Sequence, residues 1–209
     1  MNHPKDIRLQ LQAATTFLRQ QDEDWAQLVA SVGDCALTLK PERDPYEALV
    51  RAVAYQQLST KAGDAIMRKL VSHFGGAFPP PSQLIAAEFD ALRACGFSGR
   101  KVETILGIAQ GALSGLVPTG EQAEHMSDEA LIAQLVTLKG IGRWTVEMML
   151  IFTLQRLDVL PVDDFGVREG YKRLKSLELA PTPKALALIG EAWQPYRTAA
   201  AWYLWRVPK

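Results

Sequence analysis

Apolar residues recur at every third or fourth position along most of this chain, and no stretch alternates convincingly between apolar and polar residues. A spacing of three to four places apolar side chains on one face of an α-helix, whereas a strand needs a period of two. Capping signals agree with this pattern, with Asp44-Pro45 at one helix start and Gly75-Gly76 at one helix end. The sequence therefore predicts an all-α protein. The expected helices span residues 45–58, 62–74, 100–113, 127–137, 143–155, 163–176, 182–192 and 195–207.

A break in this pattern lies at residues 115–124, where Gly, Pro and Thr interrupt the periodicity. Residues 51–110 and 136–209 carry more basic than acidic side chains, while residues 111–135 between them carry acidic ones without Lys or Arg. Over the whole chain 23 Lys and Arg balance 23 Asp and Glu, so a polyanion would have to be bound by local patches. Solvated side chains on ordinary helices would give the same distribution, and charge alone leaves both explanations open.

Several classes of protein are disfavoured by simple counts. Two cysteines, Cys35 and Cys95, are too few for a disulfide framework, a four-thiolate zinc site or an iron–sulfur cluster. The N-terminal residues carry charges where a secretion signal needs an apolar core, and no apolar run approaches the ~20 residues of a membrane-spanning helix. We therefore expect a protein that is neither secreted nor membrane-bound, located in the cytoplasm (at the nucleoid of a bacterium) or in the nucleus of a eukaryote.

The most informative segment is L-K-G-I-G-R-W-T at residues 138–145, between two predicted helices. Gly140 and Gly142 allow a tight turn and leave amide N–H groups exposed at the start of the second helix. Such amides, together with the positive end of the helix dipole, bind a phosphate oxygen without reading base sequence. Many helix pairs turn on glycine for purely structural reasons, so this segment alone leaves both roles open.

Two adjacent carboxylates, Asp163 and Asp164, follow Pro161 at the start of another predicted helix. Carboxylates in this position usually cap the helix by accepting hydrogen bonds from its first amides. The same position can also serve a reaction, and the wider sequence is needed to distinguish the two roles.

Four motifs in one order supply that context. They are Y-Q-Q-L-S-T-K-A at residues 55–62, the glycine segment at 138–145, an aspartate after a proline-containing loop at 160–164, and W-Q-P-Y-R at 193–197. In this combination the chain resembles the helix-hairpin-helix DNA glycosylase superfamily, and within it the DNA-3-methyladenine glycosylase II branch. The resemblance implies one catalytic unit over residues 1–209, with two α lobes, a DNA-binding cleft between them and no N-terminal β domain. We expect one lobe at residues 45–115 and the other, with the hairpin and the catalytic aspartate, at 1–44 plus 124–209.

The resemblance also implies a reaction. It assigns catalysis to Asp164, with Asp163 capping the helix or supporting the site, and the register remains open by one residue. The expected activity is hydrolysis of the N-glycosidic bond of alkylated purines in base excision repair, with 3-methyladenine first and 7-methylguanine or ethenoadenine as further candidates. The carboxylate would stabilise positive charge on the deoxyribose or activate the attacking water. Trp144 stands where the oxidised-base branch has a Schiff-base lysine, so we expect no strand cleavage.

The resemblance further implies contacts with a flipped base and with the DNA backbone. The expected base pocket contains Trp144, Met148, Trp205 and Tyr55, with Trp202 as an alternative to Trp205 and core packing as the alternative for Trp144 and Met148. Gln57 or Leu58 is expected to fill the gap left by the base. The expected DNA contacts are Gln57, Leu58, Ser59, Arg100, Lys101, Lys139, Gly140, Gly142 and Thr145, although Arg100 and Lys101 could simply be solvated.

Cofactors and partners follow from the same resemblance. No cofactor is expected beyond a structural monovalent cation held by the carbonyls of Val136, Leu138 and Ile141. The expected partner is double-stranded DNA with damaged bases, bound by a monomer. Two alternatives remain: a non-catalytic DNA-binding module with the same hairpin, and an oxidised-base glycosylase with lyase activity.

Overall fold

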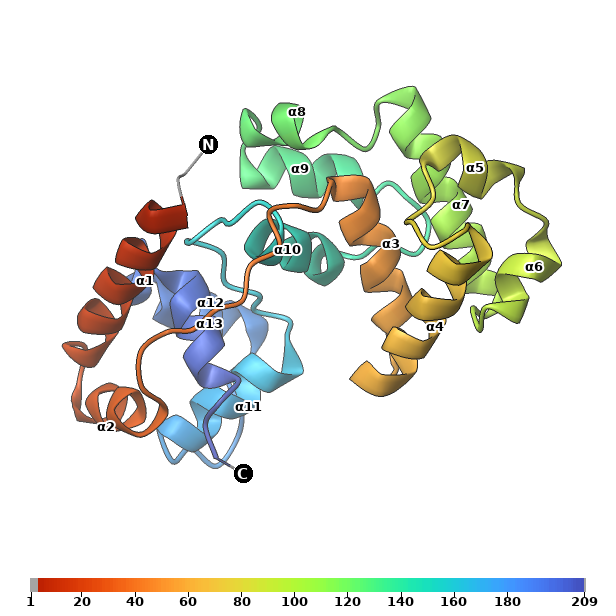
Figure 1. Cartoon of the computed structure of the whole chain (residues 1–209). Coiled ribbons are helices and arrows are strands. Elements are labelled where there is room, and N and C mark those ends of the chain that lie inside the picture. Colours follow the sequence, from red (N-terminus) through yellow and green to blue (C-terminus); the bar gives the residue numbers. More distant parts are fainter. Residues whose placement is uncertain (1–3, 209) are drawn as a thin grey trace. The chain divides into compact units, whose positions relative to one another are not determined.

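The computed structural model describes residues 4–208, and all regular elements in that range are helices (Figure 1). The prediction of an all-α protein is confirmed. The elements are α1 (Pro4–Arg19), α2 (Glu23–Val32), α3 (Pro45–Tyr55), α4 (Thr60–His73), α5 (Pro81–Ala86), α6 (Phe89–Ala94), α7 (Gly99–Ser114), α8 (Gly120–Glu124), α9 (Asp128–Leu135), α10 (Arg143–Phe152), α11 (Phe165–Leu174), α12 (Pro183–Ile189), the 3₁₀ helix η1 (Gly190–Trp193) and α13 (Arg197–Leu204).

The chain forms two compact units, and their boundaries differ from the predicted ones. One unit combines Met1–Leu39 with Arg156–Lys209, and the other is Lys40–Gln155. The predicted division placed residues 124–155 with the C-terminal segment, but α10 packs against α3 as well as α9. The hairpin between α9 and α10 therefore belongs to the unit of residues 40–155, whereas Asp164 belongs to the other unit.

Residues 115–124 are an integral part of their unit and not a linker. They contain α8, whose start is closed by a reciprocal capping box between Thr119 and Gln122. The Gln134 side-chain amide donates to the Leu116 carbonyl at 2.8 Å, and the Gly120 amide donates to Asp44 at 3.3 Å. These bonds attach the segment to α9 and to the start of α3, so the glycines and proline mark a turn within one unit.

The unit of residues 40–155 is built on α3 and α7. Leu49, Val50 and Val53 of α3 are fully buried, as are Ile105 and Ile108 of α7. The helices α4 and α10 pack on α3, and α5 packs on α7. This core fixes the positions of the α3–α4 turn and of the hairpin.

The unit with the C-terminal residues is built on the crossing of α11 and α13. Gly170 of α11 contacts the Leu204 carbonyl so closely that a Cβ atom at this position would collide with it. The buried Tyr203 hydroxyl donates to the Gly33 carbonyl at 2.8 Å, and Lys175 of α11 pairs with Asp22 and Asp24 at the start of α2. These contacts hold α2, α11 and α13 together, and α11 begins directly after Asp164.

Helix ends and short helices account for the differences from the sequence pattern. α3 ends three residues earlier than expected because Gln57 adopts a left-handed backbone with φ of +56°. α11 begins two residues later because Asp164 is its cap. The expected set lacked α1, α2, α5, α6 and α8, the last three of which have only five or six residues each.

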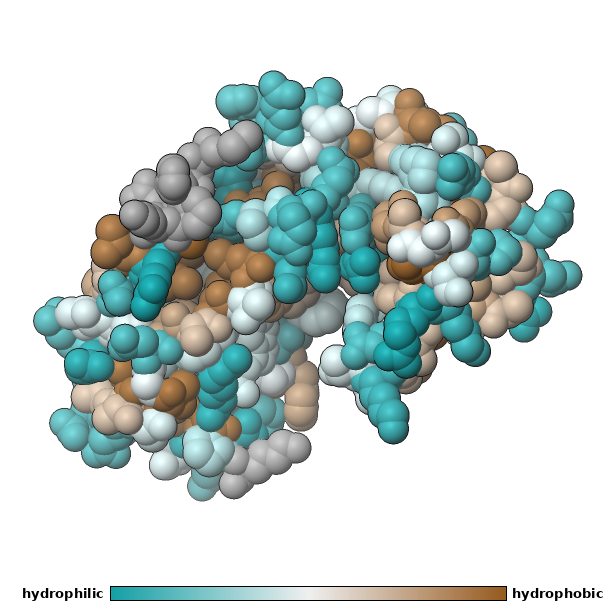
Figure 2. Space-filling view, in the orientation of Figure 1, coloured by the Kyte–Doolittle hydropathy of each residue, from teal (hydrophilic) through white to brown (hydrophobic). Residues whose placement is uncertain are grey.

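The described helices are all too short or too polar to cross a bilayer. On the face drawn in Figure 2, hydrophilic and hydrophobic residues lie side by side in small patches.

Candidate active site

Asp164 lies at the N-terminus of α11 and is held by two donors on one oxygen atom. Its Oδ1 accepts the Val167 amide at 2.8 Å, which caps the helix, and the indole Nε1 of Trp205 at 2.9 Å. Trp205 follows the last residue of α13, so the two donors come from two crossing helices. The side chain is half-buried. Two donors that converge on one oxygen fix the orientation of the carboxylate. A carboxylate that stabilises charge developing in a transition state needs such a fixed orientation.

Gly166 makes the approach of Trp205 possible. A Cβ atom at this position would lie 3.0 Å from the Trp205 Cδ1 atom and 3.1 Å from Asp164 Oδ1. A larger residue would therefore push the indole away from the acid. The close contact is local to α11 and the end of α13.

Asp163 differs from its neighbour in every contact. Its side chain is exposed and makes no hydrogen bond to any residue between 4 and 208. The capping role expected for Asp163 belongs to Asp164, because only Asp164 reaches the Val167 amide. This geometry favours Asp164 in the choice that the sequence left open.

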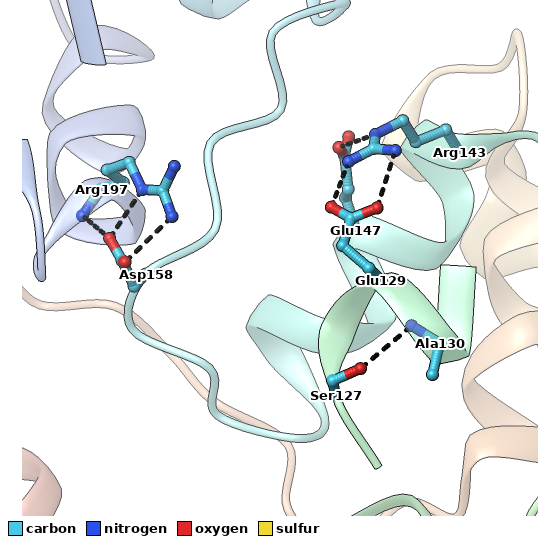
Figure 3. A network of polar contacts seen from close by, with 7 residues as sticks. All are labelled: Ser127, Glu129, Ala130, Arg143, Glu147, Asp158 and Arg197. Carbon is cyan, nitrogen blue, oxygen red and sulfur yellow. Dashed lines mark hydrogen bonds and ion pairs between the residues drawn. The ribbon is translucent and has the colours of Figure 1, made fainter. Parts of the chain in front are cut away.

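The loop that leads to Asp164 is anchored by the last of the four motifs. Arg197 binds Asp158 with Nε at 2.7 Å from Oδ1 and Nη2 at 2.9 Å from Oδ2 (Figure 3). Such a bidentate pair fixes orientation as well as distance. The W-Q-P-Y-R motif therefore supports the loop before the acid.

Trp205 is the tryptophan near the acid, and Trp202 is not. Trp202 is buried, with the Arg206 guanidinium 3.7 Å from its ring centroid. Phe165, which the sequence analysis did not select, is 75% exposed directly after Asp164. In the sequence Phe165 is only an aromatic residue at the first position of a helix. At such a position the pattern does not tell an exposed ring from a buried one.

The hairpin of residues 136–142 joins α9 to α10 in the other unit. Gly140 has φ of +86°, and a Cβ atom there would collide with the Thr104 hydroxyl of α7. Gly142 is the N-cap of α10 and supplies no side chain to its first amides, which have no acceptor within the helix. The Thr145 amide donates to the Gly142 carbonyl at 3.0 Å, and its side chain is buried. The N-terminus of α10 carries the positive end of the helix dipole, which suits an anionic oxygen.

Arg143 stabilises the hairpin arms instead of offering a free cation. Its guanidinium binds Glu147 one turn later at 3.0 Å and Glu129 of α9 at 2.8 Å (Figure 3). The hydrogen bond with Glu129 raises the pKa of the Arg143 guanidinium above its ordinary value. Ser127 caps α9 by accepting the Ala130 amide at 3.2 Å.

The monovalent-cation site expected at the carbonyls of the hairpin stays a prediction. The Leu138 carbonyl already accepts the Ile141 amide at 3.0 Å, and its second lone pair is left for an ion.

Trp144 and Met148 lie one turn apart on α10. Trp144 is 38% exposed and Met148 is half-buried, so neither is a fully buried core residue. Tyr55 lies in the same unit, but its hydroxyl donates to Asp64 of α4 and its ring covers Gly63. Tyr55 lines an open groove of about 840 Å³ along α4, together with Arg51. Its place in a base pocket stays a prediction.

The turn between α3 and α4 presents Gln57 and Leu58. Both side chains are exposed, Leu58 by 44%, and Gln57 has the left-handed backbone noted above. We call Gln56–Leu58 the wedge turn. Ser59, an expected DNA contact, caps α4 by accepting the Ala62 amide at 3.3 Å.

Two of the expected basic contacts are engaged within the protein. The ammonium of Lys101 donates to the carbonyls of Gln56 at 2.7 Å and Ala54 at 3.2 Å, so it points into the protein and not toward solvent. Lys139 is largely exposed and pairs with Glu103 at 2.8 Å. Arg100 is exposed, in agreement with a surface contact.

Comparison with known proteins identifies the family. The family described as HhH-GPD superfamily base excision DNA repair protein matches residues 50–195. The chain belongs to this superfamily. It is 46% identical to DNA-3-methyladenine glycosylase 1 of Schizosaccharomyces pombe over 98% of this chain and 91% of that protein. The crystallised 3-methyladenine DNA glycosylase (Mag1) from the same yeast, in complex with abasic DNA, has a TM-score of 0.88 and covers 93% of this chain and 95% of that one. A DNA-3-methyladenine glycosidase from Bacillus halodurans, at 37% identity, has a TM-score of 0.81 and covers 92% and 88%.

Membership of the HhH-GPD superfamily confirms the resemblance based on the four motifs. The match spans the wedge turn, the hairpin and Asp164. It ends at Pro195, ten residues before Trp205, whose contact with Asp164 comes from the structure alone. The individual site residues remain predictions, and the geometry above distinguishes which of them face outward.

Proposed function

We propose that this protein hydrolyses the N-glycosidic bond of alkylated purines in DNA, 3-methyladenine first, as a step of base excision repair. The observation that carries this proposal is the doubly held carboxylate of Asp164 in a member of the HhH-GPD superfamily. Relatives named DNA-3-methyladenine glycosylase, in yeast and in Escherichia coli, support the choice of alkylated purines.

The carboxylate acts on the sugar side of the scissile bond. As the bond to the base breaks, positive charge develops on the deoxyribose, and a fixed negative oxygen stabilises it by about 3–4 kcal/mol. The Trp205 indole and the Val167 amide hold this carboxylate through Oδ1, and we assign it to the sugar of the substrate or to the attacking water. An alkylated purine already carries positive charge on its ring and leaves without a strong general acid.

The base side needs shape and aromatic faces more than proton donors. A cationic base is attracted to an aromatic face by about 0.5–2 kcal/mol. We assign this role to Trp144 and Trp205, with Met148 and Phe165 as neighbours of the base. Trp144 cannot form a Schiff base with the sugar, so hydrolysis leaves an intact strand with an abasic site.

DNA is held by the unit of residues 40–155 through two features. The hairpin at Gly140 and Gly142, at the positive end of the α10 dipole, binds a backbone phosphate, and Gln57 or Leu58 fills the gap that the flipped base leaves. Arg100 and Lys139 add electrostatic attraction. We expect the protein to act on DNA as a monomer, at the nucleoid of a bacterium or in the nucleus of a eukaryote. The further substrates to test are 7-methylguanine and ethenoadenine.

A base-release assay across defined lesions tests this function. Duplexes containing 3-methyladenine, 7-methylguanine, ethenoadenine or 8-oxoguanine are incubated with the protein, and both the free base and the strand are analysed. We expect release of 3-methyladenine with strands that stay intact until alkali is added, and no trapping by borohydride. Trapping and cleavage at 8-oxoguanine would establish the lyase alternative, and binding without release of any base would establish the non-catalytic one.

A further inference from the structure

The wedge turn has a backbone that needs external support. Gln57 is not glycine, yet its φ of +56° lies in the left-handed region, which strains a residue with a Cβ atom. It is also exposed, so its own side chain contributes little packing. The support must come from the residues around it.

Lys101 supplies one part of this support. Its ammonium donates to the carbonyls of Ala54 and Gln56, at the C-terminal end of α3. Carbonyls at the C-terminal end of a helix lack amide donors within the helix, and a cation there also interacts favourably with the helix dipole. Lys101 therefore holds the peptide group between Gln56 and the strained Gln57, and also the one that follows Ala54 in the last turn of α3.

Gln56 supplies a second part by reaching the hairpin. Its side-chain amide donates to the Gly140 carbonyl at 3.4 Å and to the Thr145 hydroxyl at 3.3 Å. The two acceptors lie on either side of the turn into α10, in the segment whose amides suit a phosphate. One side chain thus connects the wedge turn to the hairpin, 84 residues further along the chain.

The first turns of α7 contact both features. Lys101 and Thr104 are three residues apart and therefore share one face of the helix. Lys101 reaches the wedge turn, and Thr104 packs against Gly140 of the hairpin. Glu103 adds an exposed ion pair with Lys139. All of these residues belong to the unit of residues 40–155.

We propose that Gln56 and Lys101 are positioning residues that hold the wedge turn at a fixed distance from the phosphate-binding hairpin. This inference rests on the proposed function, since it requires a DNA-inserting wedge. When the hairpin binds a phosphate, the link through Gln56 places Gln57 and Leu58 opposite the base stack. Without the link the protein still binds DNA, but it inserts the wedge poorly and captures the flipped base less often.

Two variants test the proposal, with a matched control. Gln56→Met removes the amide donor and keeps the side-chain length, and Lys101→Met removes the ammonium. Gln134→Met is the control, because it removes a partly buried hydrogen bond from a side-chain amide of α9 to the Leu116 carbonyl, in which no residue of the wedge turn takes part. Thermal unfolding of all three shows whether the fold is retained.

The first readout needs no chemistry. A duplex with an abasic-site analogue opposite 2-aminopurine reports wedge insertion as a change in 2-aminopurine fluorescence at saturating protein. We expect wild type and Gln134→Met to give the full change, and the other two variants to lose most of it while their affinity for this duplex stays within roughly 3-fold, since phosphate contacts dominate binding. An unaltered fluorescence change in Gln56→Met would overturn the proposal.

The second readout uses base release under single turnover. With 7-methylguanine in one strand, we expect Gln56→Met and Lys101→Met to slow release by roughly 10-fold when the base is paired with cytosine, and by less than roughly 2-fold opposite an abasic analogue, because an unpaired base is easier to extrude. Equal slowing on both duplexes contradicts a positioning role. If wild type releases no base from either duplex, the proposed function fails, while the fluorescence readout still decides this inference.

The salt dependence of binding distinguishes Lys101 as a support from Lys101 as a phosphate ligand. A lost phosphate contact lowers the slope of log affinity against log salt by about one. We expect the slope of Lys101→Met to equal that of wild type. A slope lower by about one would show that Lys101 binds DNA directly and would overturn its part of the proposal.

Discussion

The proposed catalytic acid of one unit and the proposed DNA-contact surface of the other are built in different ways. Asp164 is a single side chain whose Oδ1 is held by Val167 and Trp205, so its chemistry depends on one group in one orientation. The hairpin and wedge turn present backbone amides and exposed side chains that are held by several separate contacts, from Lys101 and Glu103 of α7 and from Gln56 of the wedge turn itself. A single substitution should therefore abolish catalysis in the first region and only weaken function in the second.

The strongest test of this contrast is Asp164→Asn. An amide oxygen still accepts from Val167 and Trp205, so the fold and DNA binding should survive, but the negative charge is lost. We expect base release to fall by roughly 10²–10³-fold or more in single-turnover assays. Asp163→Asn is the matched control and should retain near-normal release, because the Asp163 side chain is exposed. Comparable losses in both variants would remove the distinction between the two carboxylates.

Gly140→Ala tests the construction of the hairpin. Alanine at φ of +86° is strained and its Cβ atom collides with Thr104, so we expect a loss of about 2 kcal/mol or more in stability. Gly142→Ala is the control, because its φ is −99° and a Cβ atom there has no neighbour within 4 Å. Thermal denaturation should separate the two, with Gly140→Ala lower by several degrees. Equal melting temperatures would show that the hairpin adapts to a side chain at residue 140.

Trp205→Phe sharpens the comparison within the acid site. Phenylalanine keeps an aromatic face but lacks the indole donor at 2.9 Å from Asp164. A hydrogen bond to a charged group contributes about 1.5–3 kcal/mol, so we expect kcat to fall roughly 10-fold with little change in KM. Unchanged kcat would mean that the Val167 amide alone orients the carboxylate.

The smallest expected effect concerns the ion pairs of Lys175, at the end of α11, with Asp22 and Asp24 at the start of α2. Burial alone would raise the pKa of Asp22, but the hydrogen bonds from Lys175 and from the Trp25 amide outweigh it and the pKa is lowered. A lowered carboxyl pKa stabilises the fold above its unfolded value near 3.9, and this contribution disappears as the pH falls through the folded pKa. Because both Asp side chains are close to half exposed, we expect Lys175→Met to lose only about 0.5–1 kcal/mol at pH 7. Urea titrations should show that the difference in unfolding free energy between wild type and Lys175→Met narrows as the pH drops below 3.9. A difference that stays constant with pH would contradict the pairing.

The sequence predicted those parts of the fold that depend on neighbouring residues. The helix starts at Pro45 and Arg143 are confirmed, and the helix expected from residue 127 begins one residue later, because Ser127 is its cap. The short helices α5, α6 and α8 span fewer than two turns and leave no readable periodicity. The signals of α2, with the Asp22 cap and an acidic first turn, were present in the sequence and were not used.

The site was predictable as a set of motifs but not as a set of contacts. The motifs point to Asp164, Gly140 and Gly142 because these residues lie inside short segments that the resemblance to the family rests on. The role of Lys101 depends on a carbonyl 45 residues earlier, and that of Trp205 on an acid 41 residues earlier. No local pattern encodes such a distance, and the division between the two units was misplaced for the same reason.

The exposure of Phe165 beside a carboxylate that does not depend on it has an evolutionary consequence. The Val167 amide and the Trp205 indole hold Asp164 without the Phe165 ring, so a substitution at residue 165 alters the ring next to the acid and leaves these two hydrogen bonds in place. Under the proposed function, substrate preference can drift by mutation at this position while the reaction itself is inherited unchanged.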